Sequence, residues 1–241
     1  MLAAKTIYLN DIKSIEKLVE HWTNSNDEVL LLVLDKNAEL NTSDFEHFLS
    51  PDELVKAKKF RFDRDRSNFI LGRGCLRSFI GQALKIDPRN VQLKFNKYGK
   101  PELEANPGLK FNVSHSEDIV ILGFSKARLI GVDVERVKPF ADLLKIAANY
   151  FSNSELDRLN LIPSEEQPRA FYRCWTRKES FIKAIGDGLS FPLDKFSVTL
   201  DEDLKARLIE TSWDLSEKNR WDLGSFVPAP GYIAAYATRD F

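Results

Sequence analysis

Three strand-like segments in close succession place the strongest constraint on the fold of this chain. They are Leu109–Ser114 (LKFNVS), Ile119–Ser125 (IVILGFS) and Leu129–Val137 (LIGVDVERV). Each is rich in β-branched or aromatic residues, and only short polar stretches separate them, as is typical of strands joined by tight turns. The sequence therefore predicts a small antiparallel sheet in the middle of the chain.

In the third of these segments, apolar residues alternate with a glycine and two acidic residues. The apolar set is Ile130, Val132 and Val134, and the second set is Gly131, Asp133 and Glu135. Side chains of a strand alternate between its two faces, so both acids are expected on one face. Such a pair can place two hard oxygen ligands on one cation. Acids in this pattern are also found on ordinary solvated strands, and the pair by itself does not decide between these two interpretations.

Both helices and strands are expected before and after this sheet in the sequence. A buried strand is expected over 28–35, two helices follow Ser50, and a helix over Arg169–Ile185 ends at Gly186. Further strands are expected over 196–200 and 232–238. Because helices precede strands in both parts of the chain, we predict an α+β fold of two similar-sized halves, residues 1–130 and 131–241, each a small antiparallel sheet packed with helices.

The charge balance weighs against a general attraction to polyanions. Lys and Arg total 35 against 36 Asp and Glu, which gives a formal net charge of -1 and no global field toward nucleic acid or an anionic membrane. No segment approaches the roughly 18 continuous apolar residues of a membrane span. Cys75 and Cys174 are too few for a disulfide framework and are expected to be buried thiols. We expect a cytoplasmic protein that binds neither membrane nor nucleic acid, with any anion site local.

The helix over 169–185 carries an acid and a base at positions that share one side. Trp175, Glu179 and Lys183 recur every four residues, so they lie along one side of the helix. A side that faced the core would avoid the two charged residues. An exposed ion pair between Glu179 and Lys183, worth some tenths of a kcal/mol, is the ordinary alternative.

Several polar and basic residues upstream are suited to phosphate. Ser114 and His115 close the first strand, and Lys97 and Lys100 flank a glycine in the turn NKYGKP. A structural histidine and a solvated turn are the alternatives. The segment 56–77 carries eight Lys or Arg against two Asp, which indicates either a solvated helix face or a nucleic-acid patch.

The order of these motifs is more specific than any one of them. NKYGKPEL, FNVSHS, GVDVE and FYRCWTRKESFIKAIGDGL follow one another between Asn96 and Leu189. This set resembles the signature of the Sfp-type 4′-phosphopantetheinyl transferases, and the likeness extends over roughly residues 50 to 200. It implies a pseudo-dimer of two halves with the active site at their interface. It also implies a Mg²⁺-dependent transfer of 4′-phosphopantetheine from coenzyme A to a serine of an apo acyl or peptidyl carrier protein by a monomer, releasing adenosine 3′,5′-bisphosphate.

The resemblance also implies a role for individual residues. Mg²⁺ would be held by Asp133, Glu135 and Glu179. Glu179 would take the serine proton directly or through a metal-bound water, while Lys183 and His115 would stabilise charge on phosphoryl oxygens. The residues expected to contact coenzyme A are Lys56, Arg73, Lys97, Lys100, Ser114, His115 and Lys183. Glu53 departs from relatives that carry a basic residue there.

Two other functions remain open on the residues themselves. The same acids and lysines would serve a Mg²⁺-dependent hydrolase of a nucleotide pyrophosphate, in which water replaces the serine. The basic, phenylalanine-interleaved run from Lys56 to Arg77 would serve a non-catalytic polyanion-binding domain.

Overall fold

The computed structural model of the protein describes residues 4–25, 29–38, 40–104, 108–126, 128–202 and 204–240. Glu28, the first residue of the strand expected over 28–35, lies outside these ranges, and so does the side chain of Leu189. No helix in the described ranges has the length and apolar character that a bilayer span requires.

The first part of the chain builds a four-stranded sheet covered by helices on one face. Its strands stand in the order β1-β2-β6-β5. They are β1 (Lys5–Tyr8), β2 (Val29–Asp35), β5 (Leu109–Ser116) and β6 (Ile119–Lys126). The helices are α1 (Ser14–Asn24), α2 (Ser43–Glu46), α3 (Pro51–Lys58) and α4 (Asp63–Leu84). A two-stranded ribbon, β3 (Leu93–Phe95) and β4 (Pro101–Leu103), carries the predicted turn at its tip.

The second part builds a three-stranded antiparallel sheet in the order β10-β11-β7. Its strands are β7 (Arg128–Arg136), β10 (Trp221–Phe226) and β11 (Tyr232–Asp240). The helices that cover it are α5 (Leu143–Tyr150), α6 (Asn153–Asn160) and α7 (Gln167–Ile185). A small ribbon of β8 (Phe196–Val198) and β9 (Leu208–Thr211) lies beyond them.

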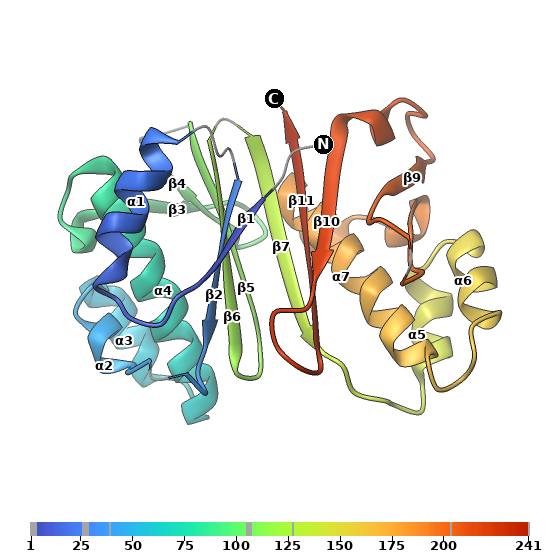
Figure 1. Cartoon of the computed structure of the whole chain (residues 1–241), viewed down its shortest axis with the longest axis horizontal. Helices are drawn as coiled ribbons and strands as arrows, with labels where there is room; N and C mark the ends of the chain where they lie inside the picture. Colours follow the sequence, from blue (N-terminus) through green and yellow to red (C-terminus); the bar gives the residue numbers. More distant parts are fainter. Residues whose placement is uncertain are drawn as a thin grey trace.

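The two sheets pack face to face in the centre of the molecule. Their apolar side chains form one buried cluster, to which the first sheet contributes Val29, Leu31, Val33, Ile119 and Ile121 and the second Ile130, Val132, Val134, Tyr232 and Ala234. Figure 1 shows the resulting order of layers, with α1–α4 outside one sheet and α5–α7 outside the other. The α+β class is confirmed, and the predicted face of β7 is the one that enters this central core.

Two details of the predicted sheets are wrong. The three middle strands do not form one sheet, because β7 pairs with β11 while β5 and β6 pair with each other. The apolar face of β7 gains burial by stacking on the first sheet, which an extension of that sheet would not give it. The first sheet is also not wholly antiparallel, since β1 pairs with β2 in parallel. The division at residues 130 and 131 stays a prediction.

Local signals fixed several helix ends as expected. Ser50 caps α3 and forms a reciprocal capping box with Glu53, and Gly186 ends α7 in the left-handed conformation (φ 93°). Cys75 and Cys174 are both buried free thiols, as predicted. The basic segment 56–77 is not a solvated face throughout, because Arg77 is buried against Glu53 and three backbone carbonyls.

Candidate active site

The edges of the two sheets meet where β5 runs beside β7. Side chains of β5 reach across this seam at every second residue. The carboxamide Oδ1 of Asn112 accepts from the backbone N–H of Val132 at 2.9 Å, and Ser114 Oγ donates to Asp133 Oδ1 at 2.9 Å. One step further on, Ser116 Oγ donates to Glu135 Oε2 at 3.0 Å. The alternation of β5 therefore orients both acids of β7.

Gly131 allows helix α7 to lie directly on β7. A Cβ atom at this position would come within 2.0 Å of the carbonyl oxygen of Ser180 and within 2.4 Å of the backbone nitrogen of Ala184. Only a residue without a side chain fits so close an approach. The contact brings Glu179 and Lys183 of α7 over the polar face of β7, where Asp133 and Glu135 point.

Lys183 pairs with Asp133 and not with Glu179. Its ammonium lies 2.5 Å from Asp133 Oδ1 and donates to Ser114 Oγ at 3.2 Å. Glu179 is only 8% exposed and Asp133 only 3%. The ordinary alternative, an exposed ion pair between Glu179 and Lys183, is therefore wrong. The predicted stripe on α7 faces the seam of the two sheets.

The charges in this cluster do not balance. Burial raises the pKa of Glu179 to about 7. The negative charges of Asp133 and Glu135 add to this rise, and the positive charge of Lys183 opposes it. Burial and the charge of Asp133 raise the pKa of Glu135. Burial alone would lower the pKa of Lys183, but the attraction of Asp133, Glu179 and Glu135 outweighs it and raises that pKa. Three carboxylates share one ammonium, an arrangement that favours a further cation.

Two oxygens of the cluster lack a partner. Asp133 Oδ2 and Glu179 Oε1 are buried and accept no hydrogen bond within the described part of the chain. Buried carboxylate oxygens are normally satisfied, and these two belong to predicted metal ligands of the type that Mg²⁺ prefers. The donor chemistry thus fits a hard divalent ion. Among the described residues, however, no three His, Cys, Asp or Glu side chains already stand together as a metal site, so the ligand assignment stays a prediction.

His115 points away from this cluster, into a neighbouring cavity of about 480 Å³. Successive residues of β5 face opposite sides, so Ser114 meets Asp133 while His115 lines the cavity. Lys56 and Arg73 line it as well, together with the aromatic rings of Phe60 and Phe69. Burial, assisted by the charge of Lys183, lowers the pKa of His115 and favours the neutral ring. Three of the predicted coenzyme A residues are thus brought together.

The aromatic rings hold the basic side chains of this cavity in place. The guanidinium of Arg73 lies 5.9 Å from the ring centres of Phe69 and Phe95, and the ammonium of Lys56 lies 5.2 Å from that of Phe69. The sequence analysis noted phenylalanines in this basic run but did not assign them to a coenzyme A site, although the i, i+4 spacing of Phe69 and Arg73 on one helix could have indicated their contact.

Glu53 has a structural part in the same region. Its carboxylate lies 3.4 Å from Arg73 Nε, accepts two hydrogen bonds from Arg77 and closes the capping box of α3. The acid that departs from the pattern of relatives therefore anchors α3 to α4.

Lys97 and Lys100 do not line the cavity. The ammonium of Lys100 donates to the carbonyl oxygens of Lys183 at 2.6 Å and of Ala184 at 3.1 Å, near the end of α7. In the same turn, Asn96 Nδ2 donates to the carbonyl of Gly186 at 2.8 Å, a contact the sequence did not signal. Lys97 is exposed, with its ammonium 4.7 Å from the ring centre of Tyr98. The turn therefore ties the first part of the chain to the end of α7.

Comparisons with known proteins give one consistent result. A model described as "4'-phosphopantetheinyl transferase superfamily" matches residues 129–237, and one described as "4'-phosphopantetheinyl transferase, N-terminal" matches residues 39–126. The chain is 35% identical to 4′-phosphopantetheinyl transferase HetI of Nostoc sp., over 90% of each chain. It is 39% identical to 4′-phosphopantetheinyl transferase Sfp of Bacillus subtilis, over 66% of this chain and 70% of the relative. A solved structure of a Chronobacterium ammoniagenes ACPS-CoA complex is similar at 18% identity and a TM-score of 0.37, covering 48% of this chain and 99% of that one.

Proposed function

The chain belongs to the 4′-phosphopantetheinyl transferase superfamily, and we propose that it moves 4′-phosphopantetheine from coenzyme A to a serine of an apo acyl or peptidyl carrier protein. The observation that carries this proposal is the position of β5 between two kinds of site. Ser114 on one face meets the acidic cluster of Asp133, and His115 on the other lines the basic cavity.

The basic cavity supplies binding and orientation for coenzyme A. We propose that Lys56, Arg73 and His115 contact its nucleotide and phosphate groups, because cationic and aromatic side chains together suit a phosphorylated nucleotide. Ser114 and Lys183 lie beside the acidic cluster, where we propose that the pyrophosphate of coenzyme A binds. Lys97 and Lys100, at the turn beside the end of α7, are proposed to contact phosphate oxygens when coenzyme A is bound.

The acidic cluster serves the chemical step. Asp133, Glu135 and Glu179 would hold Mg²⁺, which when bound supplies charge neutralisation of the pyrophosphate. The serine Oγ forms a bond to the phosphorus that carries pantetheine. The bond from that phosphorus to the bridging oxygen breaks, and the electron pair leaves with adenosine 3′,5′-bisphosphate. Glu179 takes the serine proton, and Lys183 stabilises charge that develops on phosphoryl oxygens.

A direct assay separates transfer from hydrolysis. The protein is incubated with coenzyme A and MgCl₂, with and without a panel of apo acyl and peptidyl carrier proteins, and the carriers are analysed by mass spectrometry. We expect a phosphopantetheine mass gain on at least one carrier, and no release of adenosine 3′,5′-bisphosphate without carrier. Release without carrier would support the pyrophosphate hydrolase instead.

A chelator tests the metal. Excess EDTA should stop transfer, and added MgCl₂ should restore it; full activity in EDTA would contradict the ligand assignment.

We also propose that the protein acts in the cytoplasm as a monomer, because one chain contributes both the cavity and the acidic cluster. Light scattering checks the oligomeric state and should give the mass of a single chain.

A further inference from the structure

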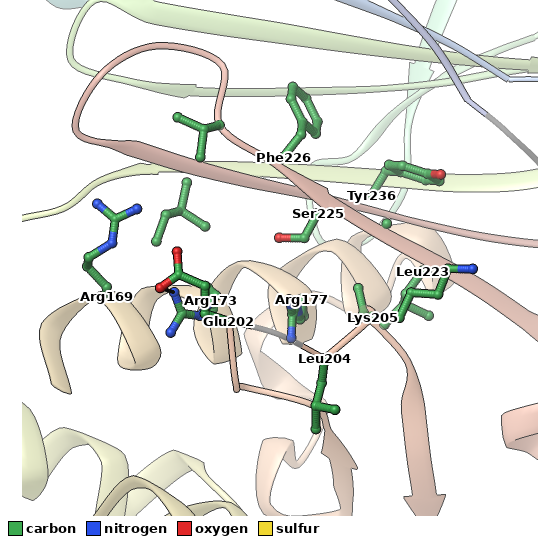
Figure 2. A pocket seen from close by; sticks show the side chains of 14 residues that line it. Arg169, Arg173, Arg177, Glu202, Leu204, Lys205, Leu223, Ser225, Phe226 and Tyr236 are labelled. Atoms are coloured by element: carbon green, nitrogen blue, oxygen red, sulfur yellow. Dashed lines mark ion pairs between the residues drawn. The ribbon is translucent and has the colours of Figure 1, made fainter. Parts of the chain in front are cut away.

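A second cavity of about 360 Å³ lies on the other side of α7. Arg169, Arg173 and Arg177 recur every four residues and form a stripe along it. Arg173 stands two positions before Trp175, about 200° around a helix of 3.6 residues per turn, so this stripe points away from Glu179. The cavity is open to solvent and is bordered by α7, by Glu202 and Lys205, and by strands β10 and β11 (Figure 2).

Two of the three arginines of this cavity are buried, and they bond mainly to backbone carbonyls. Arg173 is 8% exposed and Arg177 is 3% exposed. Arg173 donates through Nε to the carbonyl of Leu200 at 2.9 Å, and its Nη1 lies 3.5 Å from a carboxylate oxygen of Glu202, an ion pair drawn in Figure 2. Arg177 donates through Nη1 to the carbonyl of Thr199 at 2.5 Å.

Arg177 keeps unused hydrogen-bonding capacity. Its Nε is buried with no partner in the described residues. Burial and the neighbouring charge of Arg173 lower the pKa of Arg177 to about 10. Arg169, half-buried, makes no hydrogen bond or ion pair within the described ranges. Buried cations are normally paired, and Asp201 and Glu202 offset only part of this positive charge, so the stripe carries an excess of positive charge.

The rest of the lining is mostly apolar. It consists of Leu204, Ala206, Leu223, Phe226, Val227 and Ile233, with Ser225 and Tyr236 as polar neighbours. Four cationic side chains, the three arginines and Lys205, stand against the single carboxylate of Glu202, whose side chain is 73% exposed. Figure 2 shows Phe226 across the cavity from the arginine stripe, with Leu223 beside Lys205 at one end of it.

We propose that this cavity binds a small organic anion that joins one carboxylate or phosphate group to an apolar body. The arginine stripe takes the oxyanion, since guanidinium forks bind carboxylate and phosphate with two parallel hydrogen bonds. The apolar wall takes the body of the ligand. None of these residues belongs to the acidic cluster or to the coenzyme A cavity, so this is a separate site.

Calorimetric titration of the full chain tests the proposal with four probes: octanoate, octyl phosphate, octanol and inorganic phosphate. We expect saturable binding of octanoate or octyl phosphate, with octanol and inorganic phosphate each at least about tenfold weaker because one lacks the charge and the other the apolar body. The preferred headgroup identifies the source of the anion. Equal affinity for octanol, equal affinity for inorganic phosphate, or no saturable binding of either amphiphile would overturn the proposal.

Three variants locate the binding. Arg169→Gln should lower the affinity for the amphiphile about tenfold, because it removes one charge-assisted hydrogen bond. Leu204→Trp, at the half-exposed rim, should fill the cavity and abolish binding without touching a guanidinium. Arg207→Gln is the matched control, since Arg207 is exposed and lines a neighbouring hollow. An equal loss in Arg207→Gln, or full affinity in both Arg169→Gln and Leu204→Trp, would show that the ligand binds elsewhere.

Discussion

The ammonium nitrogen of Lys183 lies 2.5 Å from Oδ1 of Asp133, although 50 positions separate the two residues in the chain. This ion pair joins α7 to β7 at the seam of the two sheets, and Ser114 of β5 donates to the same carboxylate oxygen. The second oxygen of Asp133 remains buried without a partner in the described residues. The pair therefore marks the point at which both sheets and α7 meet.

Removing either buried acid should stop catalysis. We expect Asp133→Asn and Glu179→Gln each to lower the rate of carrier modification by about 100-fold or more, because each removes a charge from the proposed metal site. Both substitutions keep the side-chain shape, so the circular dichroism spectrum should not change. Glu165→Gln, at an exposed position, is the control. A phosphopantetheine mass gain at near wild-type rate in either acid variant would count against the assignment.

Gly131→Ala should destabilise the protein by about 1–3 kcal/mol or more, because its Cβ would lie within 2.0 Å of the carbonyl oxygen of Ser180 and force α7 away from β7. Urea unfolding gives the free energy. Gly72→Ala is the comparison, since its Cβ would meet only side-chain methyl groups, the nearer at 3.2 Å. Equal stability of the two variants would contradict a close approach of α7.

The fully buried ion pair of Lys178 and Glu155, 2.8 Å apart, should behave as a unit. Lys178→Met leaves the carboxylate of Glu155 buried without its cation and should cost about 3–5 kcal/mol. In the double variant Lys178→Met/Glu155→Gln no charge is left unpaired, so part of this stability should return. The recovery is incomplete because the backbone nitrogens of Ser152 and Val198 donate to different oxygens of Glu155, whereas the amide has a single acceptor oxygen. A double-mutant cycle by thermal unfolding measures the coupling; additive losses would show that the two groups act independently.

Arg73 and Lys97 should differ in their effect on coenzyme A. Arg73 lines the cavity between two aromatic rings, whereas Lys97 is exposed outside it. We expect Arg73→Met to raise the KM for coenzyme A about tenfold with little change in kcat, and Lys97→Met to raise it less. Steady-state kinetics with one carrier protein decides. If Lys97→Met has the larger effect, the nucleotide does not occupy this cavity.

Lys100 should make stability depend on pH in the alkaline range. Burial lowers the pKa of its ammonium to about 8, below the ordinary value of 10.5. Between these two values the unfolded chain holds more protons than the folded one, so the free energy of unfolding should rise as the pH increases from about 8 to 10. Lys100→Met should lose this rise. Parallel urea titrations of both proteins at several pH values measure it, and an identical pH slope in the two would refute the cause.

Local patterns were sufficient for the elements themselves. The helix expected over 169–185 is observed as Gln167–Ile185, and the alternation of the third strand correctly sent Ile130 and Asp133 to opposite faces. The same rule applied to β5 would have separated Ser114 from His115, whose side chains serve two different sites. The arginine stripe of α7 was visible in the spacing, but a spacing alone does not show whether a charged stripe is solvated or buried.

The partners of these elements were not readable from the sequence. The ladder partner of β7 is β11, about a hundred residues later, and nothing in either segment specifies that pairing over pairing with β6. The ammonium of Lys100 donates to the carbonyl oxygens of Lys183 and Ala184 near the end of α7, a contact that no local pattern indicated. Such contacts arise because buried polar groups must find partners wherever the packed chain offers them.

The sequence by itself determined which residues lie on which face of each strand and helix, because the periods of two and 3.6 residues are properties of the local backbone. It thereby determined that Asp133 and Glu135 share a face and that Glu179 and Lys183 share a stripe. Only the tertiary structure decided that Lys183 pairs with Asp133 and that His115 and Arg73 line one cavity. Those contacts depend on how two apolar sheet faces stack and on how closely Gly131 lets α7 approach, and both are set by packing across the whole chain.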